Sequence, residues 1–201
     1  MNIKLDRKFY LHNDVVTIAR NLIGKYLFTR INGVITAGMI TETEAYNGRT
    51  DRACHAHNNR FTKRTRIMYA EGGIAYVYLC YGIHNLFNIV TNVEGMADAI
   101  LIRALEPKVG LDQMLTRRQL DKSGPRVSAG PGLVTQAMGI TRVHYGADLV
   151  GDTLWLEDQG PEISLDQIAS GPRIGVDYAG EDALLPWRFW LRDSKWVSKM
   201  K

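Results

Sequence analysis

The sequence predicts an α+β fold built around a mostly antiparallel sheet, and two observations support this prediction. Runs of residues typical of β-strands outnumber the helical runs, and neighbouring runs are joined by short turns of the kind found in hairpins. The chain has 201 residues, of which 45% are hydrophobic, which suits one folded domain with a substantial core. We therefore expect a single domain over residues 1–201.

The first half of the chain carries the clearest turn signals. Asn13 and Asp14 can cap a short helix that Gly24 would close. Asn32-Gly33 lies between two strand-like runs, and this dipeptide favours a tight hairpin. The elements expected here are a helix, two strands and a long basic loop: 15–22, 25–31, 34–44 and 47–73.

The second half continues the same pattern. A second hairpin should turn near Tyr81-Gly82, and a helix should begin after Gly130-Pro131 and end at Gly139. The strands expected here are 74–80, 83–90, 99–105, 153–157 and 187–192, and the helices are 109–118 and 133–138.

Charge and cysteine content narrow the class of protein. The formal net charge is +4 and the isoelectric point is about 9.1, which favours an anionic partner such as nucleic acid or a membrane surface. Cys54 and Cys80 are too few for a disulfide framework. No apolar run reaches membrane-spanning length, and residues 1–10 do not resemble a signal peptide. We expect a soluble cytoplasmic protein with no membrane partner.

Two carboxylates stand near the end of an apolar strand, in the segment from Thr41 to Tyr46. Strand alternation places Glu42, Glu44 and Tyr46 on one face. A carboxylate at the end of a strand, beside a loop, can act as a general base. The alternative is a solvated face on which these glutamates form ordinary ion pairs.

The segment Cys54-His55-Ala56-His57 contains residue types that bind zinc. No second pair follows at the spacing of a zinc finger, and His84 and His144 stand alone. A histidine that makes hydrogen bonds from a loop is the simpler reading, and a metal site the alternative.

Tyrosines and basic residues form the third cluster. Tyr76 and Tyr78 share one face of a strand, and Tyr81 stands at the expected hairpin tip. Exposed aromatic side chains can stack on bases, and nearby cations can contact phosphates. The cations of the preceding loop are Arg60, Lys63, Arg64 and Arg66. The alternative is that the tyrosines reflect strand propensity and the charges a solvated face.

Several short segments occur in an order that identifies a family. They are Thr43-Glu44-Ala45-Tyr46, Ala53-Cys54-His55, Tyr76-Val77-Tyr78, Tyr81-Gly82, Phe87-Asn88-Ile89, 101–107, Gly130-Pro131, 173–176 and Trp187-Arg188-Phe189. With this order and spacing, the chain resembles the alkyladenine DNA glycosylases, also called 3-methyladenine or N-methylpurine DNA glycosylases. The resemblance runs from about Tyr10 to Ser198 and implies one mixed α/β domain with a protruding hairpin that inserts into DNA.

The resemblance implies a role for individual residues. Glu44 corresponds to the glutamate that activates the attacking water, and Arg103 and the backbone carbonyl of Ile174 help to hold that water. Tyr46, His55 and Tyr78 would sandwich and bond the flipped base. Asn88 would form the pocket floor, and Tyr81, with Ile83 beside it, would wedge into the DNA stack.

The activity so implied is base excision repair in duplex DNA. The enzyme would act as a monomer without metal or cofactor and hydrolyse the N-glycosidic bond of damaged purines, with no lyase activity. The substrate class is 3-methyladenine, 7-methylguanine, hypoxanthine and ethenoadenine. In a bacterium it would associate with the nucleoid, and in a eukaryote it would lie in the nucleus.

Three positions depart from the pattern of the family, and two other classes of function remain as alternatives. His84 stands where vertebrate members tend to have a tyrosine, and Gly132 and Leu133 replace polar residues expected to face the DNA backbone. Contacts to the DNA and the preference among lesions should therefore differ from those members. The alternatives from other classes are a module that binds damaged or single-stranded nucleic acid without cutting it, and a metal-dependent nuclease that uses His55 and His57.

Overall fold

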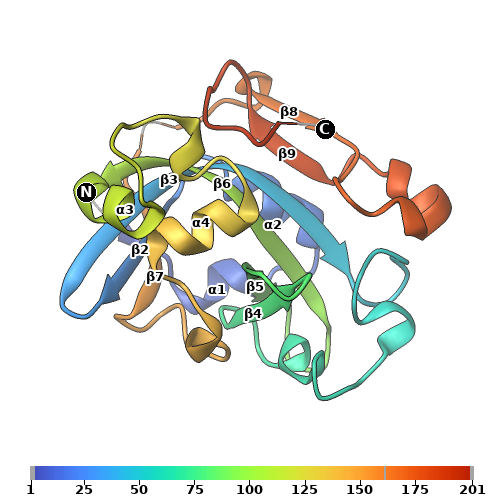
Figure 1. Ribbon diagram of the computed structural model, residues 1–201. Coiled ribbons are helices and arrows are strands. Elements are labelled where there is room, and N and C mark those ends of the chain that lie inside the picture. Colours follow the sequence, from blue (N-terminus) through green and yellow to red (C-terminus); the bar gives the residue numbers. More distant parts are fainter. Residues whose placement is uncertain (1–2, 161, 200–201) are drawn as a thin grey trace.

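The computed structural model describes residues 3–160 and 162–199, so the ends of the expected 1–201 domain lie outside the described residues (Figure 1). The strands are β1 (Ile3–Lys4), β2 (Tyr26–Ile31), β3 (Val34–Asn47), β4 (Ala75–Cys80), β5 (His84–Thr91), β6 (Asp98–Val109), β7 (Leu154–Asp158), β8 (Ile168–Gly171) and β9 (Arg188–Leu191). The α-helices are α1 (Arg7–Tyr10), α2 (Val15–Asn21), α3 (Leu111–Arg118) and α4 (Pro131–Met138). Six 3₁₀ segments connect them: His57–Asn59, Arg66–Tyr69, Pro125–Val127, Arg142–His144, Leu165–Gln167 and Asp177–Leu184.

Within the described residues, the nine strands form one sheet in the order β1-β7-β2-β3-β6-β5-β4, with β9 joining β3 to β8. Each of these pairings is antiparallel. The α+β prediction with a mostly antiparallel sheet is confirmed. Both predicted hairpins are present, β2–β3 around Asn32-Gly33 and β4–β5 around Tyr81-Gly82.

Strand β3 changes partners along its length, and this change positions the site. Its first part pairs with β2 as far as Met39, whereas Glu42 to Glu44 pair with β9. Strand β6 pairs with the other edge of β3 from Ala37 to Asn47, with irregular register around Glu42. Glu42 and Glu44 are therefore enclosed by strands on both sides, and neither is exposed.

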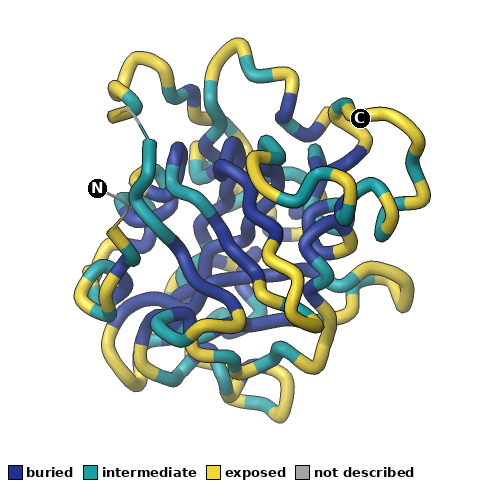
Figure 2. Tube along the Cα trace, turned by 90° about the vertical axis from the view of Figure 1, so that its left-hand side faces the viewer, coloured by how far each residue is buried: buried dark blue, intermediate teal, exposed yellow. Residues whose placement is uncertain are grey.

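The core fills both faces of the sheet. Figure 1 shows α4 in front of the sheet and α2 behind it. The Thr43 hydroxyl donates to the carbonyl of Ala19 in α2, so odd-numbered positions of this part of β3 face α2. The even-numbered Glu42, Glu44 and Tyr46 then lie on the opposite face. Buried segments occupy the middle of the molecule and exposed ones the connecting loops (Figure 2).

The structure corrects one helix boundary and adds elements that the sequence did not indicate. The helix expected from residue 109 begins at Leu111, and Val109 is the last residue of β6. Gly110 separates them with φ +72°, and a Cβ there would stand 2.7 Å from the carbonyl oxygen of Ile35. Strand β8, helix α1 and strand β1 were not predicted because each has only two to four residues.

The tip of the β4–β5 hairpin projects from the sheet. Tyr81 is 90% exposed and has φ +48°, and Ile83 is 70% exposed. A non-glycine residue in the left-handed region is uncommon, and a large aromatic so exposed contributes little to a core. Within the described parts of the chain, no helix is long and apolar enough to cross a membrane.

Candidate active site

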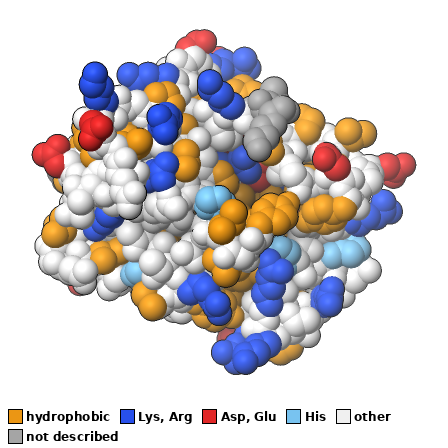
Figure 3. Space-filling model, in the orientation of Figure 1, with side chains coloured by type: hydrophobic (Ala, Val, Ile, Leu, Met, Phe, Trp, Pro, Cys, Tyr) orange, Lys and Arg blue, Asp and Glu red, His pale blue; other side chains and the backbone are white. Residues whose placement is uncertain are grey.

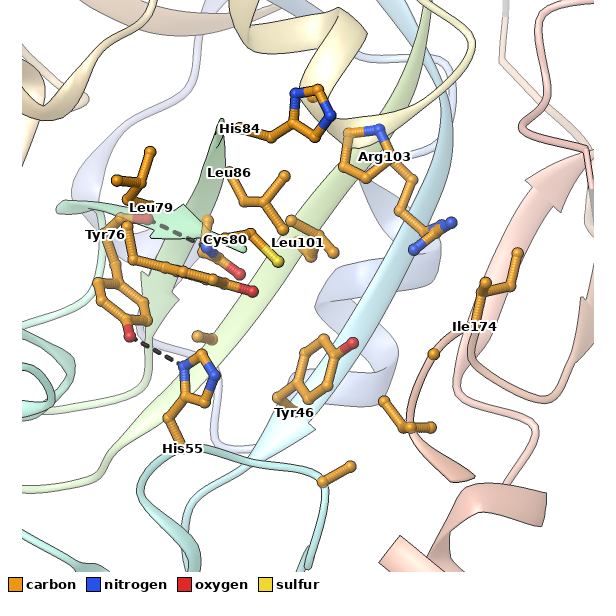
Figure 4. A pocket seen from close by; sticks show the side chains of 18 of the residues that line it. Tyr46, His55, Tyr76, Leu79, Cys80, His84, Leu86, Leu101, Arg103 and Ile174 are labelled. Carbon is orange, nitrogen blue, oxygen red and sulfur yellow. Dashed lines mark hydrogen bonds between the residues drawn. The ribbon is translucent and has the colours of Figure 1, made fainter. Parts of the chain in front are cut away.

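A pocket of about 640 Å³ opens between β4, β5, the start of α4 and the segment after β8. This volume lies within the range of about 300–1,000 Å³ that is typical of small-molecule sites. Figure 3 shows hydrophobic side chains around a hollow in the middle of one face, with histidine and basic side chains beside them. The lining that Figure 4 labels is Tyr46, His55, Tyr76, Leu79, Cys80, His84, Leu86, Leu101, Arg103 and Ile174.

The Glu44 carboxylate lies immediately behind three residues of the pocket wall. Its Oε2 accepts hydrogen bonds from the Tyr46 hydroxyl at 2.7 Å and from Arg103 Nη1 at 3.1 Å. Its Oε1 accepts one from the backbone N–H of Ile174 at 2.7 Å. A carboxylate oxygen has two lone pairs, and among the described residues Oε1 has a single donor, so it retains capacity for at least one more. Glu44 is therefore oriented from three directions, and Oε1 keeps one unused acceptor position.

Charge and burial fix the protonation of its neighbours. Burial raises the pKa of the Tyr46 hydroxyl well above its usual value, and the Glu44 charge raises it further, so this hydroxyl keeps its proton and donates. Burial opposes the charged form of Arg103, but Glu44 and Glu42 more than offset this and raise its pKa. A permanently cationic Arg103 therefore faces the carboxylate.

Arg173 holds the segment that carries Ile174. Its guanidinium donates to both carboxylate oxygens of Asp51, at 2.5 and 2.8 Å, and to the Ala45 carbonyl at 2.8 Å. The same guanidinium lies 4.8 Å from the centre of the Tyr46 ring. This fully buried ion pair ties the loop after β8 to β3, which brings the Ile174 N–H within reach of Glu44.

His55 is held as a neutral ring beside the tyrosines. Its Nε2 lies 3.1 Å from Arg64 Nη2, and its Nδ1 lies 2.9 Å from the Tyr76 hydroxyl (Figure 4). Arg64 can only donate, so Nε2 is the acceptor and Nδ1 carries the proton. Burial, with a smaller effect of the Arg64 charge, lowers the pKa of His55 to about 4. His55 is thus neutral at physiological pH.

Tyr78 and Asn88 complete the aromatic part of the wall. The Tyr78 ring lies 4.8 Å from the His55 ring, edge to face, and 4.7 Å from the Arg64 guanidinium. Asn88 is buried, lines the pocket and donates from Nδ2 to the Tyr76 carbonyl at 3.1 Å. Its amide therefore both satisfies a buried backbone group and borders the cavity.

The cysteine–histidine segment packs against other residues of the protein. Burial raises the pKa of the Cys54 thiol to about 12, so the thiol is protonated in the protein as it stands. Both ring nitrogens of His55 already have partners. Among residues 3–160 and 162–199, no three His, Cys, Asp or Glu side chains gather in a way that could hold a metal ion.

The structure brings most of the site residues expected from the sequence to one place. Those that line the pocket are Tyr46, His55, Tyr78, Tyr81, Asn88, Arg103 and Ile174. Glu44 lies behind this wall, and Ile83 lies on the hairpin outside it. Contact to Glu44 comes from the backbone N–H of Ile174, whereas the sequence analysis assigned a role to its carbonyl.

Two departures from the family turn out to be neighbours. A Cβ added to Gly132 would lie 3.0–3.1 Å from the His84 side chain, so the imidazole packs closely over this glycine. Sequence reasoning missed the partners of Glu42, which are Arg103, Arg188 and Ser198. It also gave Arg64 a contact to phosphate and no role at the pocket. The one signal in the sequence was Glu42 itself, because an acidic residue in an apolar strand needs a buried partner of opposite charge.

Comparison with known proteins adds a family to this geometry. The sequence profile of the Methylpurine-DNA glycosylase family matches residues 8–195. The chain belongs to that family. The matches cover 89–100% of the length of the relatives. A protein of Chlamydia felis named "Putative 3-methyladenine DNA glycosylase" is 45% identical over 192 residues, covering 95% of this chain and 97% of the relative.

Two further relatives carry the same name. The protein from Methanocella arvoryzae is 45% identical over 196 residues, covering 97% of this chain and 96% of its own. The protein from Alkaliphilus oremlandii is 38% identical over 208 residues, covering 98% and 100%. The family resemblance stated from the ordered motifs is therefore confirmed, and it ties the protein to DNA repair by base excision.

Proposed function

We propose that this member of the Methylpurine-DNA glycosylase family flips damaged purines out of duplex DNA and hydrolyses their N-glycosidic bond, leaving an abasic site. The substrate class is that of 3-methyladenine, 7-methylguanine, hypoxanthine and ethenoadenine. One observation carries the proposal: a buried Glu44 carboxylate accepts hydrogen bonds from Tyr46, Arg103 and the Ile174 N–H, and these three residues line an aromatic pocket.

The aromatic wall suits a flipped and electron-poor base. Tyr46 and Tyr78 present ring faces on which a purine can stack, and His55 offers a neutral ring with defined hydrogen-bonding atoms. Alkylated purines are often cationic, and a cation over an aromatic face gains about 0.5–2 kcal/mol. Damaged pairs also open more easily. The protein would therefore favour damaged bases at two steps, when the base pair opens and when the base stacks in the pocket.

Glu44 supplies the chemistry. Cleavage of a glycosidic bond builds positive charge on the sugar, as in other glycoside hydrolyses. The ionised carboxylate stabilises that charge and orients a water through the remaining capacity of Oε1. Arg103 and the Ile174 carbonyl help to hold this water. A cationic base then leaves without further protonation.

The hairpin tip and the basic loop would contact the DNA. A base inside a duplex must be rotated out, at a cost of a few kcal/mol of unstacking. Tyr81, with Ile83 beside it, would fill the gap, because both side chains project into solvent next to the pocket. Exposed cations on the loop before β4 would contact the phosphates: Arg60, Lys63, Arg64 and Arg66.

The reaction would stop at the abasic site, and the protein would act as a monomer without a cofactor. Strand cleavage by a lyase step requires an amine that forms a Schiff base with the sugar. Among the described residues that line the pocket, none is a lysine. This supports a hydrolase that uses water alone.

Release of free base from DNA tests the proposal. Oligonucleotide duplexes that each carry one defined lesion are incubated with the protein, and the released base and the abasic sites are quantified separately. We expect free base and alkali-sensitive abasic sites in equal amounts. Tight binding of the lesion duplex without any free base would identify a damage-binding module, and strand breaks without alkali would reveal a lyase.

A further inference from the structure

We propose that Glu42 and Ser198 are positioning residues that hold Arg103 against Glu44, so that the segment after β9 contributes to catalysis. This inference rests on the proposed function. We use the name charge cluster for the group formed by Glu42, Glu44, Arg103, Arg188 and Ser198. All five side chains are buried, with exposed fractions between 0 and 8%.

Arg103 uses its whole guanidinium to link the members of the charge cluster. Its Nε donates to Glu42 Oε1 at 2.9 Å, and its Nη1 donates to Glu44 Oε2 at 3.1 Å. Its Nη2 donates to the Ser198 hydroxyl at 3.2 Å. The guanidinium is planar and rigid, so fixing two of its nitrogens fixes the direction of the third. Glu42 and Ser198 therefore determine how Arg103 meets Glu44.

Glu42 differs from Glu44 in how many hydrogen-bond donors its carboxylate already binds. Its Oε1 accepts from Arg103 Nε, from Arg188 Nε at 2.7 Å and from the Ser198 hydroxyl at 2.7 Å. Its Oε2 accepts from the Ser198 backbone N–H at 2.6 Å. The Glu42 carboxylate is thus engaged by three residues of the protein, and both of its oxygens already have donors. It acts through Arg103 and not on the substrate.

The charges of the cluster balance. Two carboxylates face two guanidiniums, with contacts of 2.7 to 3.1 Å. Buried charges are tolerated when they are paired and hydrogen-bonded, and the loss of one partner leaves an uncompensated group that rearranges. Weakening one contact of Arg103 would therefore let its guanidinium turn away from Glu44.

The Ser198 hydroxyl lies between Arg103 and Glu42 and makes a hydrogen bond to each. The hydroxyl accepts from Arg103 Nη2 and donates its single proton to Glu42 Oε1. It thereby links Arg103 Nη2 to the Glu42 carboxylate, which Arg103 also contacts directly through Nε. The same segment is anchored independently of the charge cluster, because the Thr41 hydroxyl donates to the Trp196 carbonyl at 2.5 Å.

This independent anchor provides a matched control. Ser198→Ala removes the hydroxyl that contacts Arg103, and Ser198→Thr keeps a hydroxyl. Thr41→Val removes a buried hydroxyl that holds the same segment to the same strand without touching the charge cluster. Single-turnover base release, affinity for the lesion duplex and thermal unfolding are measured for the four proteins. The duplex carries one hypoxanthine.

We expect Ser198→Ala to slow the single-turnover step by about ten- to a hundred-fold, since small misplacements of catalytic groups have effects of this size. Affinity for the lesion duplex should stay within about two-fold of wild type, because Ser198 is buried and does not line the pocket. Ser198→Thr should recover most of the lost rate. Thr41→Val should lower the unfolding temperature as much as Ser198→Ala does, yet keep the wild-type rate.

A second variant keeps the inference falsifiable if Ser198→Ala fails to fold. Glu42→Gln preserves shape and the acceptor for Arg103 but removes the charge, and it should show the same slow step with retained affinity. Equal slowing in Thr41→Val and Ser198→Ala, or a wild-type rate in Ser198→Ala or Glu42→Gln, would overturn the positioning role. The proposed function fails separately, if the wild-type protein releases no base at all.

Discussion

The charge cluster beneath the pocket and the tip of the β4–β5 hairpin differ most in burial. Glu42 and Glu44 are completely enclosed by strands, whereas Tyr81 is 90% exposed. In the cluster each group depends on its neighbours, because the low dielectric makes an unpaired charge costly. At the tip, a side chain can change with little effect on folding. Chemistry and DNA insertion should therefore respond separately to mutation.

The largest effect is expected inside the charge cluster. Glu44→Gln keeps the shape of the side chain but removes its negative charge and its strength as a base. Base release should fall by about a hundred- to ten-thousand-fold, the range of general-base contributions, while the lesion duplex still binds. Single-turnover release and equilibrium binding measure the two quantities, with the exposed Glu94→Gln as control. Near-normal release would remove Glu44 from the mechanism.

A smaller effect on a different quantity is expected at the tip. Tyr81→Ala should weaken affinity for the lesion duplex by about ten- to a hundred-fold, in line with about 1–3 kcal/mol for a stacked aromatic, and leave the unfolding temperature unchanged. Leu165→Ala is the control, because Leu165 is 67% exposed and does not line the pocket. A collapse of thermal stability with unchanged affinity would show that Tyr81 is a structural residue and does not insert into DNA.

Asn88 combines a structural contact with a place at the pocket, since it borders the cavity and also donates a hydrogen bond to the Tyr76 carbonyl. We expect this residue to face the minor-groove edge of the flipped purine, as the family resemblance implies, where guanine carries an amine that hypoxanthine lacks. Asn88→Ser should raise excision of guanine relative to hypoxanthine by about ten-fold, because small steric changes in a pocket have effects of this order. Rates on matched duplexes and a melting curve are needed. An unchanged ratio with lower stability would leave Asn88 a purely structural role.

His55 gives a pH-dependent test of the pocket wall. Burial lowers its pKa from 6.5 to about 4 in the folded protein. Between these values the unfolded chain takes up a proton that the folded protein excludes, so the free energy of unfolding falls as the pH drops from 6.5 to 4. His55→Gln should lose less stability over this window, as measured by urea unfolding. Identical pH dependence in both proteins would show that His55 titrates normally when folded.

No effect is expected from chelation. Cys54 is a buried neutral thiol and both nitrogens of His55 have partners, so EDTA should leave base release unchanged. The control is a parallel reaction with added zinc. Loss of release with EDTA and its return with zinc would replace the Glu44 mechanism with a metal site.

Local patterns account for the parts of the fold that the sequence predicted. Asn32-Gly33 and Tyr81-Gly82 specify turns through a few residues, and helix α2 begins at the expected cap Asp14. Strand alternation placed Glu42, Glu44 and Tyr46 on one face. The helix boundary at residue 109 was wrong because Val109 pairs with Ala37, a contact between distant parts of the chain.

The sequence by itself determined the residue types of the site, their order and the turns that separate them. The tertiary structure decided which of them meet. Ser198 reaches Glu42 across 156 positions, and Arg173 reaches Asp51 across 122. From the sequence, a solvated face with ordinary ion pairs was the simpler interpretation of Glu42, because an acidic side chain is costly to bury without partners. Its burial became possible through two guanidiniums and a hydroxyl brought from β6, β9 and the segment after β9, which no local pattern encodes.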